Sequence, residues 1–217
     1  MREGLPKTFF GIGCWYEIIS CMSVARANNF SEIDYVFLDR DGVINRSFTH
    51  GHYLRRWEEV ELLPGVEDAI AQLNRSGRKV IVATNQRGVA LGLCTEAELQ
   101  ELHARLQQHL AAHGAHLDAI YYCPHDNGQC NCRKPLPGMF EQAFRDFSGA
   151  SAATSVMIGD SLSDVETGRQ VGMRTVFIAA PGQSPKPGAE QASAMATACA
   201  ESLLDFVEQY LVCDRPA

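Results

Sequence analysis

The chain has 217 residues, of which 46% are hydrophobic and 21% charged, and its formal net charge is −7. This composition excludes a largely disordered chain, and the negative charge disfavours general binding to DNA or RNA, which needs a basic surface. Residues 1–30 are predicted to form a loose N-terminal extension. Their apolar stretch resembles a secretory signal, but Glu17 interrupts it and leaves pieces too short to span a membrane. We expect one folded domain over residues 31–217.

From residue 31 onward, short apolar runs alternate with amphipathic stretches. The apolar runs lack polar alternation, which indicates strands buried on both faces, at Tyr35–Leu38, Lys79–Thr84, Ala119–Tyr122, Ser155–Ile158 and Thr175–Ile178. Helices are predicted from Val66 to about Gly77, from Thr95 to before Gly114, over Gly138–Phe147, near Ser163–Val171 and over Glu201–Leu211. Residues 181–199 are rich in Gly, Pro, Ser and Ala and are predicted to be a loop. The pattern predicts an α/β fold with a Rossmann-like, doubly wound parallel sheet.

Polar side chains follow three of the predicted strands. They are Asp39 and Asp41 after the first, Thr84, Asn85 and Gln86 at the end of the second, and Asp160 and Asp164 after the fourth. Ligands of such sheets bind beyond the carboxyl ends of the strands, so we expect these groups to line one site. Carboxylates suit Mg²⁺, and a threonine hydroxyl with nearby backbone N–H groups suits phosphate oxygens. Each segment alone is also compatible with an ordinary turn or helix cap.

A second group of residues follows the third predicted strand. Cys123, His125, Cys130 and Cys132 supply three thiolates and one imidazole, a complete tetrahedral set for a structural Zn²⁺. A redox pair and unrelated free thiols are the alternatives, and the histidine between the cysteines favours zinc. Residues 123–132 are therefore predicted to form a zinc-stapled loop. Lys134 follows at once, and Pro135 keeps it extended, which makes its ammonium a positioned charge.

These segments together resemble the haloacid dehalogenase (HAD) superfamily of phosphohydrolases. The order Asp39-x-Asp41, Thr84, Lys134 and Gly159-Asp160 is similar to the four motifs of that superfamily. The sequence Asp39-Arg-Asp-Gly-Val-Ile-Asn45, the Thr84-Asn-Gln86 segment, and the zinc-stapled loop with Arg133-Lys-Pro135 resemble one subfamily more narrowly. That subfamily comprises the D-glycero-D-manno-heptose 1,7-bisphosphate 7-phosphatases and the related histidinol-phosphate phosphatases, and the resemblance covers about residues 33–180.

The resemblance implies hydrolysis of a phosphomonoester through an aspartyl-phosphate. Asp39 would be the nucleophile and Asp41 the general acid and base, while Thr84 and Lys134 would stabilise the phosphoryl oxygens. Mg²⁺ would be held by the carboxylates of Asp39 and Asp160 and the backbone carbonyl of Asp41, with Asp164 in support. The substrate contacts are expected to come from Asn85, Gln86, Arg133 and Tyr53. The segments between the motifs leave no room for a large cap domain.

The expected substrate is a sugar bisphosphate, foremost the heptose 1,7-bisphosphate. Histidinol phosphate stays open as an alternative because both subfamilies share the zinc-stapled loop. An alternative of another class is a non-catalytic, zinc-stabilised binding module. We expect a cytoplasmic monomer that binds neither nucleic acid nor membranes.

Overall fold

The computed structural model describes residues 30–47 and 53–211, so nearly all of the predicted N-terminal extension lies outside the described residues. A six-stranded sheet with the order β3-β2-β1-β4-β5-β6 forms the centre of the molecule, and every pair of neighbouring strands is parallel. The strands are β1 (Tyr35–Leu38), β2 (Lys79–Asn85), β3 (Ala119–Cys123), β4 (Ser155–Gly159), β5 (Arg174–Ile178) and β6 (Ala198–Ala200). The predicted doubly wound α/β fold is confirmed.

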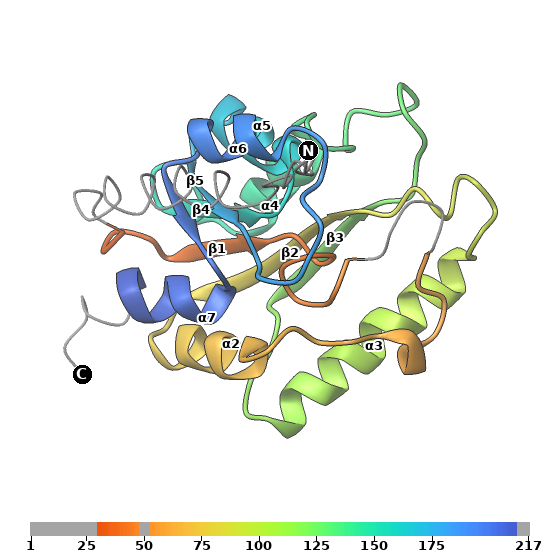
Figure 1. Cartoon of the computed structure of the whole chain (residues 1–217), viewed down its shortest axis with the longest axis horizontal. Helices are drawn as coiled ribbons and strands as arrows, with labels where there is room; N and C mark the ends of the chain where they lie inside the picture. The colour runs from red at the N-terminus through yellow and green to blue at the C-terminus, as the bar shows by residue number, and fades with distance from the viewer. Residues whose placement is uncertain (1–29, 48–52, 212–217) are drawn as a thin grey trace, which may run out of the picture.

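Helices cover both faces of the sheet (Figure 1). One face carries α2 (Val66–Arg75), α3 (Glu96–Ala112) and α7 (Leu203–Phe206), and the other carries α4 (Gly138–Asp146), α5 (Leu162–Gln170) and α6 (Ala189–Met195). A 3₁₀ turn η2 (Trp57–Glu59) precedes α2, and a π-helical turn η3 (Val207–Leu211) continues α7. Alternate residues of β1 divide between the two cores, because Val36 and Leu38 join the cluster around α2 while Phe37 packs with Phe140 of α4.

The prediction of a loop over residues 181–199 is wrong for its second half. Helix α6 and strand β6 lie there, and β6 pairs with β5 as the sixth strand. The Gly and Pro residues stop at Gly188, whose φ of 81° begins α6, and the small apolar residues that follow are good helix formers or fit a buried edge. Composition alone merged these two parts, because alanine and serine are common in both loops and helices.

The helix that follows β2 shows how local sequence sets the elements that position the site. Thr95 accepts a hydrogen bond from the backbone N–H of Glu98, and the Glu98 carboxylate accepts one from the backbone N–H of Thr95, at 3.1 and 2.7 Å. This capping box starts α3, as its sequence predicts. The helix ends before Gly114, which has a φ of 72°. Its start and end are therefore fixed within the segment that connects β2 to β3.

The described residues form this one layered unit and no cap domain. Among residues 30–47 and 53–211, no helix has both the length and the apolar composition that a membrane crossing requires.

Candidate active site

The register of the sheet brings the predicted site residues to one edge. Leu38 at the end of β1 pairs with Val82 of β2 on one side and with Ile158 of β4 on the other. The polar residues that follow these strands therefore meet. Ligand oxygens of three carboxylates, those of Asp39, Asp160 and Asp164, lie within 4.8 Å of one another.

Lys134 enters this carboxylate cluster from the chain beyond β3. Its Nζ lies 3.0 Å from Oδ1 of Asp39 and 2.5 Å from Oδ1 of Asp164, and it also donates to the carbonyl of Ala83 at 2.7 Å. Burial disfavours the ammonium, but the charges of Asp164 and Asp39 outweigh burial and raise the pKa of Lys134. The lysine is thus a charged group held at a fixed place.

Asn85 explains why Lys134 stays there. The Asn85 side chain donates from Nδ2 to the carbonyl oxygen of Lys134, and its Oδ1 accepts from the backbone N–H of Lys134, both at 3.0 Å. Both polar atoms of the amide are thereby engaged. Asn85 thus holds the backbone of Lys134, and its contact with substrate stays a prediction.

The carboxylates of Asp39 and Asp160 lie in an environment that calls for a nearby positive charge. Burial, opposed by the charge of Lys134, raises the pKa of Asp39. Burial also raises the pKa of Asp160 to about 7, although Lys186 acts against it. Buried carboxylates placed this close repel each other unless positive charge lies between them.

Lys186 is a site residue that the sequence analysis missed. Its Nζ donates to Oδ1 of Asp160 at 2.6 Å and to the backbone carbonyl of Asp41 at 3.0 Å. It lies in the Pro-Lys-Pro part of the segment predicted to be a loop, and no local pattern connects it to the strand ends. Its position shows that the oxygens of Asp41 and Asp160 together hold a cationic group.

The same oxygens fit a divalent metal ion. The donor set of Asp39, Asp160 and the Asp41 carbonyl consists of oxygens alone, as hard cations such as Mg²⁺ prefer. Gly42 makes the close approach possible, because a Cβ built there would lie 1.9 Å from Oδ2 of Asp160, and its φ is 102°. The turn after β1 therefore lies directly against the Asp160 carboxylate.

Asp41 lies in a separate hydrogen-bond network. Its carboxylate accepts from Arg40 Nη2 at 2.9 Å, from Asn45 Nδ2 at 2.9 Å and from Gln86 Nε2 at 3.0 Å. Burial opposes the charge of Asp41, but Arg40 and the two amide donors outweigh it and hold the pKa of Asp41 below its usual value. Gln86 also donates to Oγ1 of Thr84 at 3.0 Å, so it connects the ends of β1 and β2.

The remaining predicted substrate contacts are Arg133 and Tyr53. Arg133 donates from Nε to Oδ1 of Asn127 at 2.8 Å, and its buried Nη1 has no hydrogen-bond partner within residues 30–47 and 53–211. Tyr53 lies against Gly88, where a Cβ would come 2.6 Å from Cδ1 of the tyrosine. Arg133 therefore offers a donor for an anionic or hydroxylated ligand, and Tyr53 packs against the loop that follows β2.

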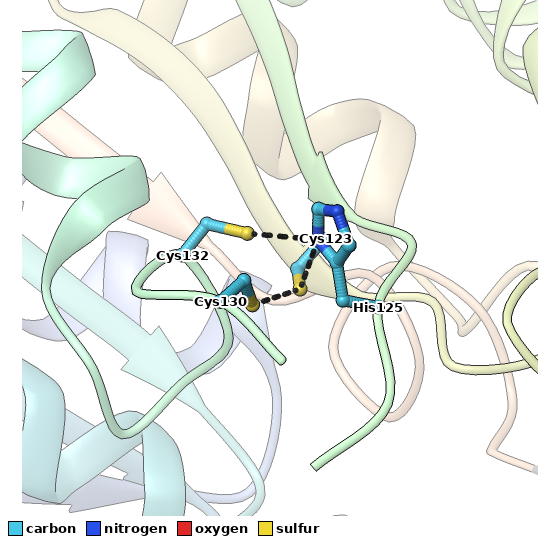
Figure 2. A group of neighbouring side chains, drawn as sticks. All are labelled: Cys123, His125, Cys130 and Cys132. Atoms are coloured by element: carbon cyan, nitrogen blue, oxygen red, sulfur yellow. Dashed lines mark hydrogen bonds between the residues drawn. The ribbon is translucent and has the colours of Figure 1, made fainter. Parts of the chain in front are cut away.

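The predicted zinc ligands come together at the end of β3. Figure 2 shows Cys123 and His125 from one stretch of chain facing Cys130 and Cys132 from the returning stretch. The Cys123 and Cys130 sulfurs are 3.5 Å apart, and Nδ1 of His125 lies 3.7 Å from the Cys123 sulfur and 3.4 Å from that of Cys132. Ligands about 2.0–2.3 Å from a tetrahedral zinc are about 3.4–3.8 Å apart, so the four atoms have the spacing of a metal site.

Comparison with known proteins agrees with this geometry. The family model described as HAD-hydrolase-like matches residues 131–206. The chain is 40% identical over 185 residues to the D-glycero-beta-D-manno-heptose-1,7-bisphosphate 7-phosphatase of Vibrio cholerae, covering 82% of this chain and 95% of that protein. It is 38% identical over 172 residues to the D-glycero-alpha-D-manno-heptose-1,7-bisphosphate 7-phosphatase of Mycobacterium bovis, covering 79% and 88%.

A solved structure shows the same relationship. The D,D-heptose 1,7-bisphosphate phosphatase of B. bronchiseptica, complexed with magnesium and phosphate, superimposes with a TM-score of 0.71 at 33% identity, covering 82% of this chain and 97% of that one. The fold and the site thus define a phosphatase of the HAD-like hydrolases. Within that class, the chain belongs to the D-glycero-D-manno-heptose-1,7-bisphosphate 7-phosphatase family.

Proposed function

We propose that this protein removes the 7-phosphate from D-glycero-D-manno-heptose 1,7-bisphosphate by way of an aspartyl-phosphate on Asp39. The observation that carries the proposal is the convergence of Asp39 after β1, Asp160 after β4 and Lys134 from the chain beyond β3, with Lys134 Nζ 3.0 Å from Asp39. The substrate is inferred from the relatives named above, because each is a heptose bisphosphate phosphatase.

Each residue of the site has a defined part in this reaction. A carboxylate oxygen of Asp39 attacks phosphorus, and the ester bond to the sugar oxygen breaks. The Lys134 ammonium and the Thr84 hydroxyl stabilise the phosphoryl oxygens. Mg²⁺ would be held by Asp39, Asp160 and the Asp41 carbonyl, where it would neutralise negative charge, as Lys186 does in part here.

Asp41 moves the protons. It protonates the leaving sugar oxygen in the first step and takes a proton from the attacking water in the second. The low pKa that Arg40 and its neighbours impose suits the carboxylate for the second step. The approach of a phosphate dianion acts in the opposite direction and favours the protonated form for the first step.

We further propose that Cys123, His125, Cys130 and Cys132 hold one structural Zn²⁺. Four protein ligands leave no position open for water or substrate, so the metal would staple the loop. Asn85 bonds the backbone of Lys134, and Asn85 is in register with Cys123, so the stapled loop lies next to the catalytic lysine.

We propose that Arg133 binds the second phosphate of the substrate. Its Nη1, which has no hydrogen-bond partner in the part of the chain that the structure describes, belongs to a planar fork that matches phosphate geometry. Histidinol phosphate has one phosphate only, so this contact favours the bisphosphate over histidinol phosphate.

A direct comparison of substrates tests the proposal. We expect kcat/KM for phosphate release to be highest with one anomer of the heptose 1,7-bisphosphate and low with histidinol phosphate, in the presence of Mg²⁺. Both anomers belong in the assay, since one relative is named for the alpha form of the substrate and another for the beta form. A preference for histidinol phosphate would overturn the substrate, and no phosphate release from any ester would overturn the activity.

We also propose that the enzyme works as a monomer in the cytoplasm. Reduced thiols such as those of the cysteine–histidine cluster suit a reducing compartment, and one chain supplies every residue of the proposed site. Light scattering on the purified protein tests the first point, and fractionation of cells tests the second.

A further inference from the structure

Arg40, between the two aspartates of the first motif, is buried and held at both ends. Only 1% of the residue is exposed. The Nε and Nη2 side of the guanidinium faces the carboxylate of Asp41, with Nη2 donating to Oδ1 at 3.0 Å and to Oδ2 at 2.9 Å. The same Nη2 donates to Oε1 of Gln86 at 3.1 Å. The opposite nitrogen, Nη1, points away from the aspartate and needs an acceptor of its own.

His103 of α3 supplies that acceptor. Its Nε2 lies 3.1 Å from Nη1 of Arg40. An arginine has donors only, so Nε2 of His103 must carry the lone pair and its ring proton must be on Nδ1. Only 6% of His103 is exposed. Burial, followed by the charge of Arg40, lowers the pKa of His103 to about 3, which agrees with a ring that stays neutral.

The contacts form a chain of three residues from α3 to the reacting region. His103 fixes one end of the guanidinium, and the other end fixes both oxygens of Asp41. Asp41 has further donors in Asn45 and Gln86, but each of these contributes a single hydrogen bond. Among the described residues, Arg40 is the one that bonds both oxygens of Asp41, and His103 is the one that bonds Nη1 of Arg40.

We propose that His103 is a positioning residue for catalysis, which acts through Arg40 to hold the Asp41 carboxyl in the orientation that proton transfer to the leaving group requires. This inference rests on the proposed function, because it assigns His103 a part in that reaction.

The first chemical step shows what a misplaced Asp41 would affect. The bond from Asp39 oxygen to phosphorus forms, the bond from phosphorus to the ester oxygen breaks, and that oxygen keeps the electron pair and takes the proton of Asp41. A sugar alkoxide is a poor leaving group and needs this proton. The nitrophenolate of p-nitrophenyl phosphate leaves without it. Loss of orientation at Asp41 therefore slows the sugar substrate and spares the aryl substrate.

The test compares kcat/KM for the two substrates in the wild type and in His103→Leu. This parameter covers the reaction up to the loss of the leaving group. We expect the ratio of sugar phosphate to aryl phosphate activity to fall at least about tenfold, within the range that general acid catalysis supplies. His103→Gln keeps an acceptor near Nη1 and is expected to restore most of the ratio.

Leu106→Ala is the matched control, because Leu106 is buried on the same helix and is no part of the Arg40 network. We expect it to lower the melting temperature and leave the ratio unchanged. If His103→Leu fails to fold, Arg40→Lys keeps the charge, removes the fork, and is expected to give the same fall in the ratio.

Different results would contradict the proposed function and the positioning role of His103. A wild type that hydrolyses neither substrate removes the proposed function. An active wild type whose His103→Leu and Arg40→Lys variants slow both substrates equally, or neither, overturns the positioning role. The positioning role is also overturned if His103→Gln lowers the ratio of sugar phosphate to aryl phosphate activity as much as His103→Leu does. The loss of the acceptor would then not be the cause.

Discussion

Two clusters of residues that could hold metal ions follow strands of this sheet, and they are built in opposite ways. The carboxylate cluster of Asp39, Asp160 and Asp164 draws residues from segments far apart in the sequence, and the sheet register brings them together. The cysteine–histidine cluster takes all of its ligands from residues 123–132. The first cluster depends on the fold, whereas the second cluster, with the proposed zinc, would staple a loop with few apolar residues of its own.

We expect the carboxylate cluster to serve the chemistry and the cysteine–histidine cluster to serve the stability of the fold. Buried carboxylates stabilise nothing by themselves, since burial raises the pKa of both Asp39 and Asp160, and lysines are needed to offset it. Closed sets of thiolate and imidazole ligands stabilise a fold when they bind zinc. Changes in the carboxylate cluster are therefore expected to lower activity, and changes in the cysteine–histidine cluster to lower stability first.

The largest effect is expected from Asp39→Asn. The amide keeps the volume of the side chain and removes the nucleophilic oxygen anion, so turnover should fall by roughly 10³-fold or more while the fold persists. Phosphate release and thermal melting measure the two parts. Asp146→Asn, an isosteric change at an exposed carboxylate, is the control and should change neither. Substantial activity in a clean Asp39→Asn preparation would contradict the covalent route.

Gly42→Ala is expected to have the next largest effect on activity. An added Cβ would fall 1.9 Å from Oδ2 of Asp160 and would strain a residue with a φ of 102°, so Asp160 or the turn has to move. Displacing the Asp160 carboxylate by about 1 Å is expected to lower kcat by roughly 10²-fold. Gly77→Ala is the control, because Gly77 also has a positive φ of 78° but nothing within 4 Å of the added atom. Equal activity of the two variants would show that the close approach to Asp160 is unimportant.

Cys130→Ser tests the cysteine–histidine cluster. Removal of one of four ligands should release the zinc and lower the melting temperature by roughly 5–10 °C, as expected for a loss of about 2–3 kcal/mol in a chain of this size. Metal analysis and calorimetry measure both. Cys94→Ser replaces another buried cysteine that is not part of the cluster and should retain the zinc. Metal-free protein that melts at the wild-type temperature would refute the staple.

The smallest effect is expected in the pH dependence of stability, through His103. Above its usual pKa of 6.5 the histidine is neutral in both the folded and the unfolded chain. Between pH 6.5 and about 3, the unfolded chain binds a proton at His103 that the folded protein excludes, so acidification favours unfolding. We expect the urea midpoint to fall less in His103→Gln than in the wild type between about pH 7.5 and pH 5. Equal slopes would mean that the ring is not held neutral in the fold.

Much of the fold and of the candidate site follows from the sequence, for identifiable reasons. Buried parallel strands have continuous apolar runs, and their ends carry Asp39, Thr84 and Asp160, so topology rules alone place these residues at one edge. The cysteine–histidine cluster is local and is predicted from its spacing. Helix α6 and strand β6 were missed because their composition resembles that of a loop.

The contacts made by residues outside the recognised patterns could not be predicted. Lys186 reaches Asp160 from a connection after β5, and His103 reaches Arg40 across 63 positions of sequence. Each is a single side chain whose partner is set by the packing of a helix or loop against the sheet. No periodicity or spacing carries that information.

The double hydrogen bond between Asn85 and the backbone of Lys134 has a consequence for how this protein can diverge. Cys123 is anchored by the sheet, in register with Asn85, and Lys134 is anchored by Asn85 itself, so both ends of the intervening segment are fixed independently of its middle. Insertions or deletions between His125 and Cys130 can therefore reshape the loop next to the proposed site while the Lys134 ammonium stays in place. Under the proposed function, loop length is therefore a means of changing the substrate range without moving Lys134.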